Sequence, residues 1–138
     1  MQDYDVTLKS LLQTPGGGFL QRLTGAPVEH WMNIEIPRVQ TGRVDLLGRM
    51  AAGGLLHVEL QSANDFQMAL RMAEYLLWIY RQFGQFARQI VLYMGDAELR
   101  MAAELKAPSY ASSYTLVDIR EIDASELFAS PQVDTKTC

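Results

Sequence analysis

The sequence lacks most of the features that mark a secreted or membrane-bound protein. It has a single cysteine, Cys138, which excludes an intramolecular disulfide and a metal site built from several cysteines within these residues. No apolar run approaches the roughly 20 residues that a membrane-spanning helix needs. Asp3 and Asp5 precede the first apolar residues, which is not typical of a secretory signal. We therefore expect a cytoplasmic protein that folds without disulfides.

The composition is that of one globular domain. The 138 residues are 49% hydrophobic and 20% charged, which is too apolar for a disordered chain and enough for a single core. We predict one domain over residues 1–130 and a polar, disordered tail over residues 131–138.

Lysine is absent from the middle of the chain, where all basic residues are arginines. The net charge is −4, which argues against a nucleic-acid partner, but residues 38–88 hold six arginines against four acids, a local balance of +2. Arginine can contact phosphate oxygens in a bidentate way that lysine cannot. The alternative is that these arginines pair with nearby acids. The six are Arg38, Arg43, Arg49, Arg71, Arg81 and Arg88.

The hydrophobic pattern predicts a mixed α/β chain. Strands are expected at 31–36, 43–50, 55–61, 88–94 and 114–120, and helices at 5–13, 65–83 and 123–128. A helical turn is expected at 19–23, and helix or turn at 96–105.

The longest helix, residues 65–83, should cover one face of the sheet. Ser62 or Asn64 would cap its beginning and Gly84 would end it. Its predicted buried stripe has helical spacing and consists of Phe66, Ala69, Leu70, Ala73, Leu76, Leu77, Tyr80 and Phe83.

Residues 43–50 and 55–61 read as a hairpin with one polar face on each strand. His57, Glu59 and Gln61 alternate with apolar residues in the second strand, and Asp45 and Arg49 do so in the first. The two polar faces coincide only if paired residues have an even sum of numbers, which requires a turn of three or five residues or a bulge. We predict that register, which sets Asp45 opposite Glu59 or Gln61 at a Cβ separation of about 4.5–5.5 Å.

Two adjacent carboxylates are typical of a site for a hard cation. Asp45 and Glu59, with the backbone carbonyl of Leu60, would suit Mg²⁺ or Mn²⁺ better than zinc. Such a metal can activate a water and stabilise charge on a phosphate, and Gln61 could orient that water. The alternative is that both acids pair with Arg43, Arg49 or His57 on a solvated face of the sheet. His57 reads as a companion of Glu59 rather than as a metal ligand.

Three segments of the sequence, RVDLLGRM, LLHVELQSANDFQMALRMAEYLLWIYRQFG and RQIVLYMG, together resemble the Rpn/YhgA-like family. These are recombination-promoting nucleases, some of them proposed transposases, of the PD-(D/E)XK nuclease superfamily. The resemblance runs over residues 4–128. It implies a restriction-endonuclease-like α-β-β-β-α-β core with a mixed central sheet flanked by helices.

The resemblance also implies roles for particular residues. Asp45 would be the metal-binding aspartate and Glu59 its partner carboxylate, while Gln61 stands where the superfamily more often has lysine. Arg71 and Tyr75 match the recurring Arg and Tyr of the family's next helix. Asp5 and Lys9 match its opening D-x-x-x-K helix.

These observations together predict a metal-dependent endonuclease that hydrolyses phosphodiester bonds in DNA. Asp45, Glu59 and Gln61 would form the catalytic site, and Arg49 or Arg71 would steady the phosphate. DNA binding would be weak and salt-dependent, and a homodimer would double the phosphate contacts. The residues do not distinguish DNA from RNA as substrate.

The alternative prediction is a catalytically silent nuclease-fold scaffold or protein-interaction domain. In that case Met72, Tyr75 and Trp78 would be exposed on the long helix and form a protein interface.

Overall fold

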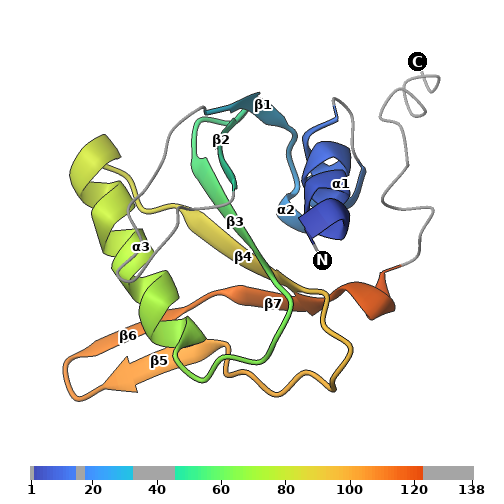
Figure 1. Ribbon diagram of the computed structural model, residues 1–138. Helices are drawn as coiled ribbons and strands as arrows, with labels where there is room; N and C mark the ends of the chain where they lie inside the picture. Colours follow the sequence, from blue (N-terminus) through green and yellow to red (C-terminus); the bar gives the residue numbers. More distant parts are fainter. Residues whose placement is uncertain (1, 15–17, 33–45, 123–138) are drawn as a thin grey trace.

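The structure is a computed structural model that describes residues 2–14, 18–32 and 46–122. Within these ranges it forms helices on both faces of a mixed sheet, as the sequence predicts (Figure 1). The elements in chain order are α1 (Gln2–Gln13), α2 (Gly18–Thr24), β1 (Val28–Trp31), β2 (Leu46–Met50), β3 (Leu55–Gln61), α3 (Met68–Phe83), β4 (Arg88–Tyr93), β5 (Glu104–Ala107), β6 (Tyr110–Ser113), β7 (Thr115–Asp118) and the 3-10 turn η1 (Ile119–Glu121).

The central sheet has the strand order β1-β2-β3-β4-β7. Strands β1, β2 and β3 pair antiparallel, whereas β3, β4 and β7 pair parallel. A parallel pair needs a long crossover connection, and α3 supplies it between β3 and β4. The order α1, β1, β2, β3, α3, β4 is therefore an α-β-β-β-α-β core, which confirms the predicted fold class and is compatible with a restriction-endonuclease-like fold.

Helices cover both faces of the sheet, so the inner strands β3 and β4 are buried on both sides. Figure 1 shows α3 on one side and α1 and α2 on the other. Leu56, Val58 and Leu60 of β3 pack in the cluster that contains residues of α1 and α2, whereas Leu55 packs in the cluster with α3. The two-stranded sheet of β5 and β6 lies beside one end of α3.

The turn between β2 and β3 has the predicted odd length. Met50 N–H donates to the Gly54 carbonyl at 2.7 Å, which leaves residues 51–53 as a three-residue turn. Gly53 has a φ of +105°, a conformation that a residue with a Cβ rarely adopts. The register pairs Leu46 with Val58, so the sum of paired numbers is even, as predicted.

The predicted buried stripe of the long helix is wrong for half of its eight members. Ala73 is buried, but four residues of that stripe are exposed: Phe66, Leu70, Leu77 and Tyr80. The buried side of α3 consists instead of Met68, Met72, Ala73, Tyr75 and Ile79. The helix has apolar residues around most of its circumference, so periodicity alone does not select one face. The interface proposed for a silent scaffold is also wrong in two residues, because Met72 and Tyr75 are buried and only Trp78 is partly exposed.

The long helix begins later than predicted. Its first residue is Met68, and neither Ser62 nor Asn64 caps it. Asp65 provides the local bonds instead: its side chain accepts the Gln67 N–H at 2.9 Å and its carbonyl accepts the Met68 N–H at 3.0 Å. The predicted end is confirmed, because Gly84 adopts the left-handed conformation with a φ of +72°.

Other boundaries differ in detail. Residues 96–103 are not helical, and β5 begins at Glu104. The strand predicted over 114–120 is β7, which ends at Asp118 where the 3-10 turn begins. The strand predicted at 31–36 corresponds to β1, which begins at Val28 and whose pairing ends at Trp31. The predictions for residues 33–36, 43–45, 123–128 and 131–138 lie outside the described residues.

No helix within residues 2–14, 18–32 and 46–122 is long and apolar enough to cross a membrane.

Candidate functional site

The polar residues of β3 lie on the face of the sheet that α3 covers. His57 and Glu59 alternate with Leu56, Val58 and Leu60, which pack toward α1 and α2. His57 is 0% exposed and Glu59 is 1% exposed. The alternative of a solvated sheet face is therefore wrong for this strand.

His57 and Glu59 form a direct pair in the interior. His57 Nε2 lies 2.9 Å from Glu59 Oε2, which confirms His57 as the companion of this carboxylate. On the other side of the ring, His57 Nδ1 lies 3.0 Å from Gln89 Nε2. The Tyr75 ring meets the imidazole edge to face, with 5.3 Å between ring centroids. Hydrogen bonds on both nitrogens are what a buried polar ring requires.

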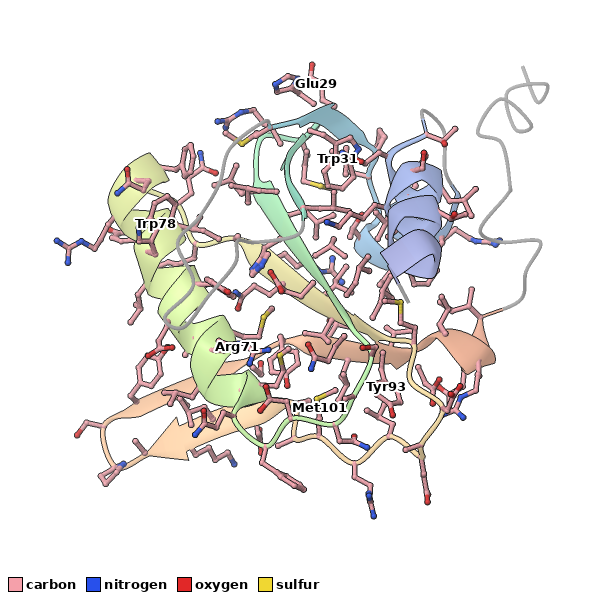
Figure 2. The ribbon with its side chains drawn as sticks, in the orientation of Figure 1. Glu29, Trp31, Arg71, Trp78, Tyr93 and Met101 are labelled. Carbon is pink, nitrogen blue, oxygen red and sulfur yellow. The ribbon has the colours of Figure 1, made fainter. Side chains whose placement is uncertain are left out.

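Gln61 ends β3 and is tied to the beginning of α3. Its Nε2 donates to the Ala63 carbonyl at 3.0 Å, and its Oε1 lies 3.5 Å from Arg71 Nη2, the donor. Arg71 Nη1 also donates to Asp65 Oδ2. Figure 2 shows Arg71 on the side of α3 that faces the sheet. Arg71 therefore carries an ion pair and also steadies Gln61.

The loop after β4 is held against the end of β3. Asn64 Nδ2 donates to the Glu98 carbonyl at 2.9 Å, and Asn64 Oδ1 accepts the Arg100 N–H at 2.7 Å. The Tyr93 hydroxyl donates to the Ala97 carbonyl at 2.7 Å. These bonds fix the loop at the edge of the sheet where the parallel strands β3 and β4 end. Ligands commonly bind at this edge of α/β sheets.

The carboxylate of Asp65 has a pKa lowered from its ordinary value of 3.8. The largest cause is the hydrogen bond from the Gln67 N–H; burial opposes it, and Arg71 adds to the lowering. Because the folded-state pKa is depressed, Asp65 stabilises the fold above pH 3.8 and this stabilisation is lost as the pH falls through the folded-state value.

We expect the Asp65→Asn variant not to show this loss of stability at acidic pH. Between about pH 5 and about pH 2 the wild type should lose up to about 1 kcal/mol more than the variant, a small value because the ion pair is partly solvated. Arg71→Met should remove only part of the effect, since the Gln67 N–H remains. Urea unfolding at a series of pH values measures this difference, and parallel curves for wild type and Asp65→Asn would contradict it.

Two of the other predicted residues, Arg49 and Leu60, lie on the described strands of the sheet. Arg49 pairs with Leu55, four residues before Glu59, so about 13 Å of strand separates it from Glu59 and the structure does not bring the two together. Leu60 lies between Glu59 and Gln61 in the sequence, and its side chain packs on the other face of the sheet, in the cluster with α1 and α2. Asp45 lies outside the described residues, and so does the side chain of Asp5. Lys9 is half-buried on α1.

Two residues of this site were missed by sequence reasoning. Gln89 lies in the strand predicted over 88–94, for which the sequence suggests no site residue, yet it is buried and bonded to His57. A polar residue in a strand buried on both faces is itself a signal, because such a group needs a partner. Asp65 was read only as the start of the helix, although an acid six residues before Arg71 can reach it across the first turn.

The donors present suit a hard cation but do not form a complete site in the described residues. Glu59 has carboxylate oxygens, one of which is bonded to His57, and His57 is bonded in turn to Gln89. Among residues 2–14, 18–32 and 46–122, no group of three or more His, Cys, Asp or Glu side chains is arranged to hold a metal. A metal site at Glu59 would therefore need a further ligand from outside these ranges.

No family model matches the chain, and no curated protein matches it. Among solved structures, the chain is similar to a complex of EndoMS with double-stranded DNA, at 20% sequence identity and a TM-score of 0.35. The similarity covers 47% of this chain and 28% of that chain. A likeness at this level indicates neither a shared site nor a shared activity.

Proposed function

We propose that this protein is a metal-dependent nuclease that hydrolyses phosphodiester bonds in DNA. Glu59 and Asp45 would be the carboxylate ligands of a Mg²⁺ or Mn²⁺ ion, with the Leu60 carbonyl as a further oxygen ligand. The fold supports the proposal, because Glu59 lies near the carboxyl end of β3, the middle strand of the sheet.

The observation that carries the proposal is the register of β2 on β3. Leu46 pairs with Val58 in an antiparallel ladder. Asp45 directly precedes Leu46 in the sequence, and Glu59 directly follows Val58. Continuing this ladder by one residue would pair the two acids, and opposed residues of an antiparallel pair have Cβ atoms about 4.5–5.5 Å apart. Two carboxylates at that separation repel each other unless a cation lies between them.

The residues around Glu59 suit a magnesium site. Oxygen ligands are those that Mg²⁺ prefers, and it typically takes one or two protein carboxylates. When bound, such an ion lowers the pKa of a coordinated water and stabilises charge on the phosphate. Gln61 Oε1 has a second lone pair beyond the one facing Arg71, and we propose that it orients the attacking water.

Substrate binding by this protein should be weak and electrostatic. Arg71 remains our proposed phosphate contact, although a phosphate would have to compete with Asp65 for its guanidinium. With a net charge of −4, the chain as a whole repels a polyanion, so binding should depend on local arginine–phosphate contacts and weaken as the salt concentration rises. A homodimer would double the phosphate contacts, and we propose one.

We expect nicking of supercoiled plasmid at low salt with Mg²⁺ or Mn²⁺, and its loss in Glu59→Gln. Removing groups that only support a metal ligand costs about 10–100-fold, so removing the ligand charge should cost at least about 100-fold. Glutamine keeps an acceptor for His57, so the variant should stay folded, which circular dichroism would verify. Glu98→Gln is the matched control, because this glutamate is exposed on the loop after β4.

Two results would count against the proposal. Cleavage that persists undiminished in Glu59→Gln would place the activity elsewhere or in a contaminant. No cleavage by the folded wild type with either metal would favour the second candidate, a partner-binding domain. That candidate is supported by the exposed apolar side chains at the outer side of α3 and the following loop, which are Leu70, Leu77, Tyr80 and Phe86.

A further inference from the structure

Three polar side chains are buried together beneath α3. His57 and Glu59 come from β3 and Gln89 from the neighbouring strand β4, where the register pairs His57 with Gln89. Burying a polar group costs free energy unless it is hydrogen-bonded. Hydrogen bonds among the three and to the backbone meet part of that requirement, and they fix the proton on the imidazole.

The orientation of the Gln89 amide follows from the backbone of α3. One end of the amide lies 2.9 Å from the Met72 carbonyl oxygen, which can only accept. This end must therefore be Nε2, because two oxygens at that distance would repel. The same Nε2 lies 3.0 Å from His57 Nδ1 and donates its second hydrogen there. His57 Nδ1 is thus an acceptor.

The tautomer of His57 follows in turn. A neutral imidazole has one donor and one acceptor nitrogen, so with Nδ1 accepting, the proton is on Nε2. Nε2 then donates to Glu59 Oε2 at 2.9 Å. The opposite tautomer would set two donors against each other at Nδ1 and two acceptors against each other at Nε2. The Tyr75 ring, edge to face with the imidazole, holds the plane of the ring as well.

We propose that Gln89 and His57 are positioning residues that orient the Glu59 carboxylate for a divalent cation. This inference rests on the proposed function, in which Glu59 is a metal ligand. The chain of donors runs from Gln89, anchored on the Met72 carbonyl, through His57 to Oε2 of Glu59. It fixes the rotation of the carboxylate before any metal binds, and it resembles the outer contacts that orient metal ligands in general.

The tautomer is the first test, and it needs neither metal nor activity. In ¹⁵N-histidine NMR of the wild-type protein, we expect the His57 signal to show the proton on Nε2. His30→Gln assigns the signals, since His30 is exposed on β1 and is the other histidine of the chain. In Gln89→Met the proton should stay on Nε2, because Glu59 still accepts it, whereas the ¹⁵N shift of Nδ1 should change because its donor is gone. A wild-type ring protonated on Nδ1 would overturn the proposed chain of hydrogen bonds from Gln89 through His57 to Glu59.

The second test is the affinity for Mn²⁺, measured from the electron paramagnetic resonance signal of the free ion. We expect His57→Leu to weaken Mn²⁺ binding by about 10–100-fold, and His57→Gln, which keeps an N–H donor, to restore most of it. Gln89→Met should weaken binding less than His57→Leu, because the histidine is still present. His30→Gln should bind as the wild type does.

The outcomes separate this inference from the proposed function. Mn²⁺ binding that is unchanged in folded His57→Leu would overturn the positioning role and leave the nuclease proposal intact. Equal losses in His57→Leu and His57→Gln would also overturn it, because a merely structural role predicts no rescue by a donor. A wild type that binds no Mn²⁺ would overturn the proposed function. It would also overturn the role of Gln89 and His57 in orienting a metal ligand.

Discussion

Ile79→Ala is expected to lower the free energy of unfolding by about 2–5 kcal/mol, the range for removing a fully buried aliphatic side chain from a packed core. Ile79 is 0% exposed and lies in the cluster between α3 and the sheet. Alanine would leave a cavity there that neighbouring strands cannot fill, because they are fixed by their own hydrogen bonds. Urea or thermal unfolding measures the difference.

Leu77→Ala is the matched control on the same helix. Leu77 is 46% exposed, so its replacement should change stability by no more than about 0.5 kcal/mol. The pair also tests which side of α3 faces the sheet. The stripe predicted from the sequence buries Leu77 and leaves out Ile79, whereas the structure has the reverse. A larger loss in Leu77→Ala than in Ile79→Ala would contradict the structure.

Gly95→Ala is expected to destabilise the protein by about 1–3 kcal/mol through overpacking. A Cβ at this position would lie 2.5 Å from the Ser62 carbonyl oxygen and 2.6 Å from Tyr93 Cζ. Neither neighbour can retreat easily. The Tyr93 hydroxyl is bonded to the Ala97 carbonyl, and the Met94 N–H donates to the Gln61 carbonyl at 2.8 Å beside Ser62. Because Gln61 belongs to the proposed site, the same change should also lower the proposed cleavage.

Gly54→Ala serves as the control for Gly95→Ala. A Cβ on Gly54 meets nothing within 4 Å, and Gly54 has no positive φ. It should be neutral or stabilise the protein by about 0.4–1 kcal/mol, because alanine restricts the unfolded chain. Denaturant unfolding of both variants would test the prediction, and similar losses at the two glycines would show that the crowding at Gly95 is not the cause.

The sequence by itself determined the local features of the fold. Alternation of apolar and polar residues defined β3 to its correct ends. It left the register between β2 and β3 open, and the structure confirms the predicted even register through a three-residue turn. Gly84 ended α3 where predicted, since a left-handed C-cap favours glycine. The polar face of β3, with His57 beside Glu59, was equally readable because residues two apart on a strand share a face. Each of these depends on neighbours within a few residues.

Only the tertiary structure decided which face of α3 is buried and what surrounds Glu59. The helix is apolar around most of its circumference, so its orientation was set by the crossover that lays it on the sheet between the parallel strands β3 and β4. That crossover covers the polar face of β3, which the alternation alone allowed to be solvated. Parallel pairing also brings Gln89 beside His57 across 32 positions of sequence. Contacts over such a separation follow from how whole elements pack, which no local pattern of residues specifies.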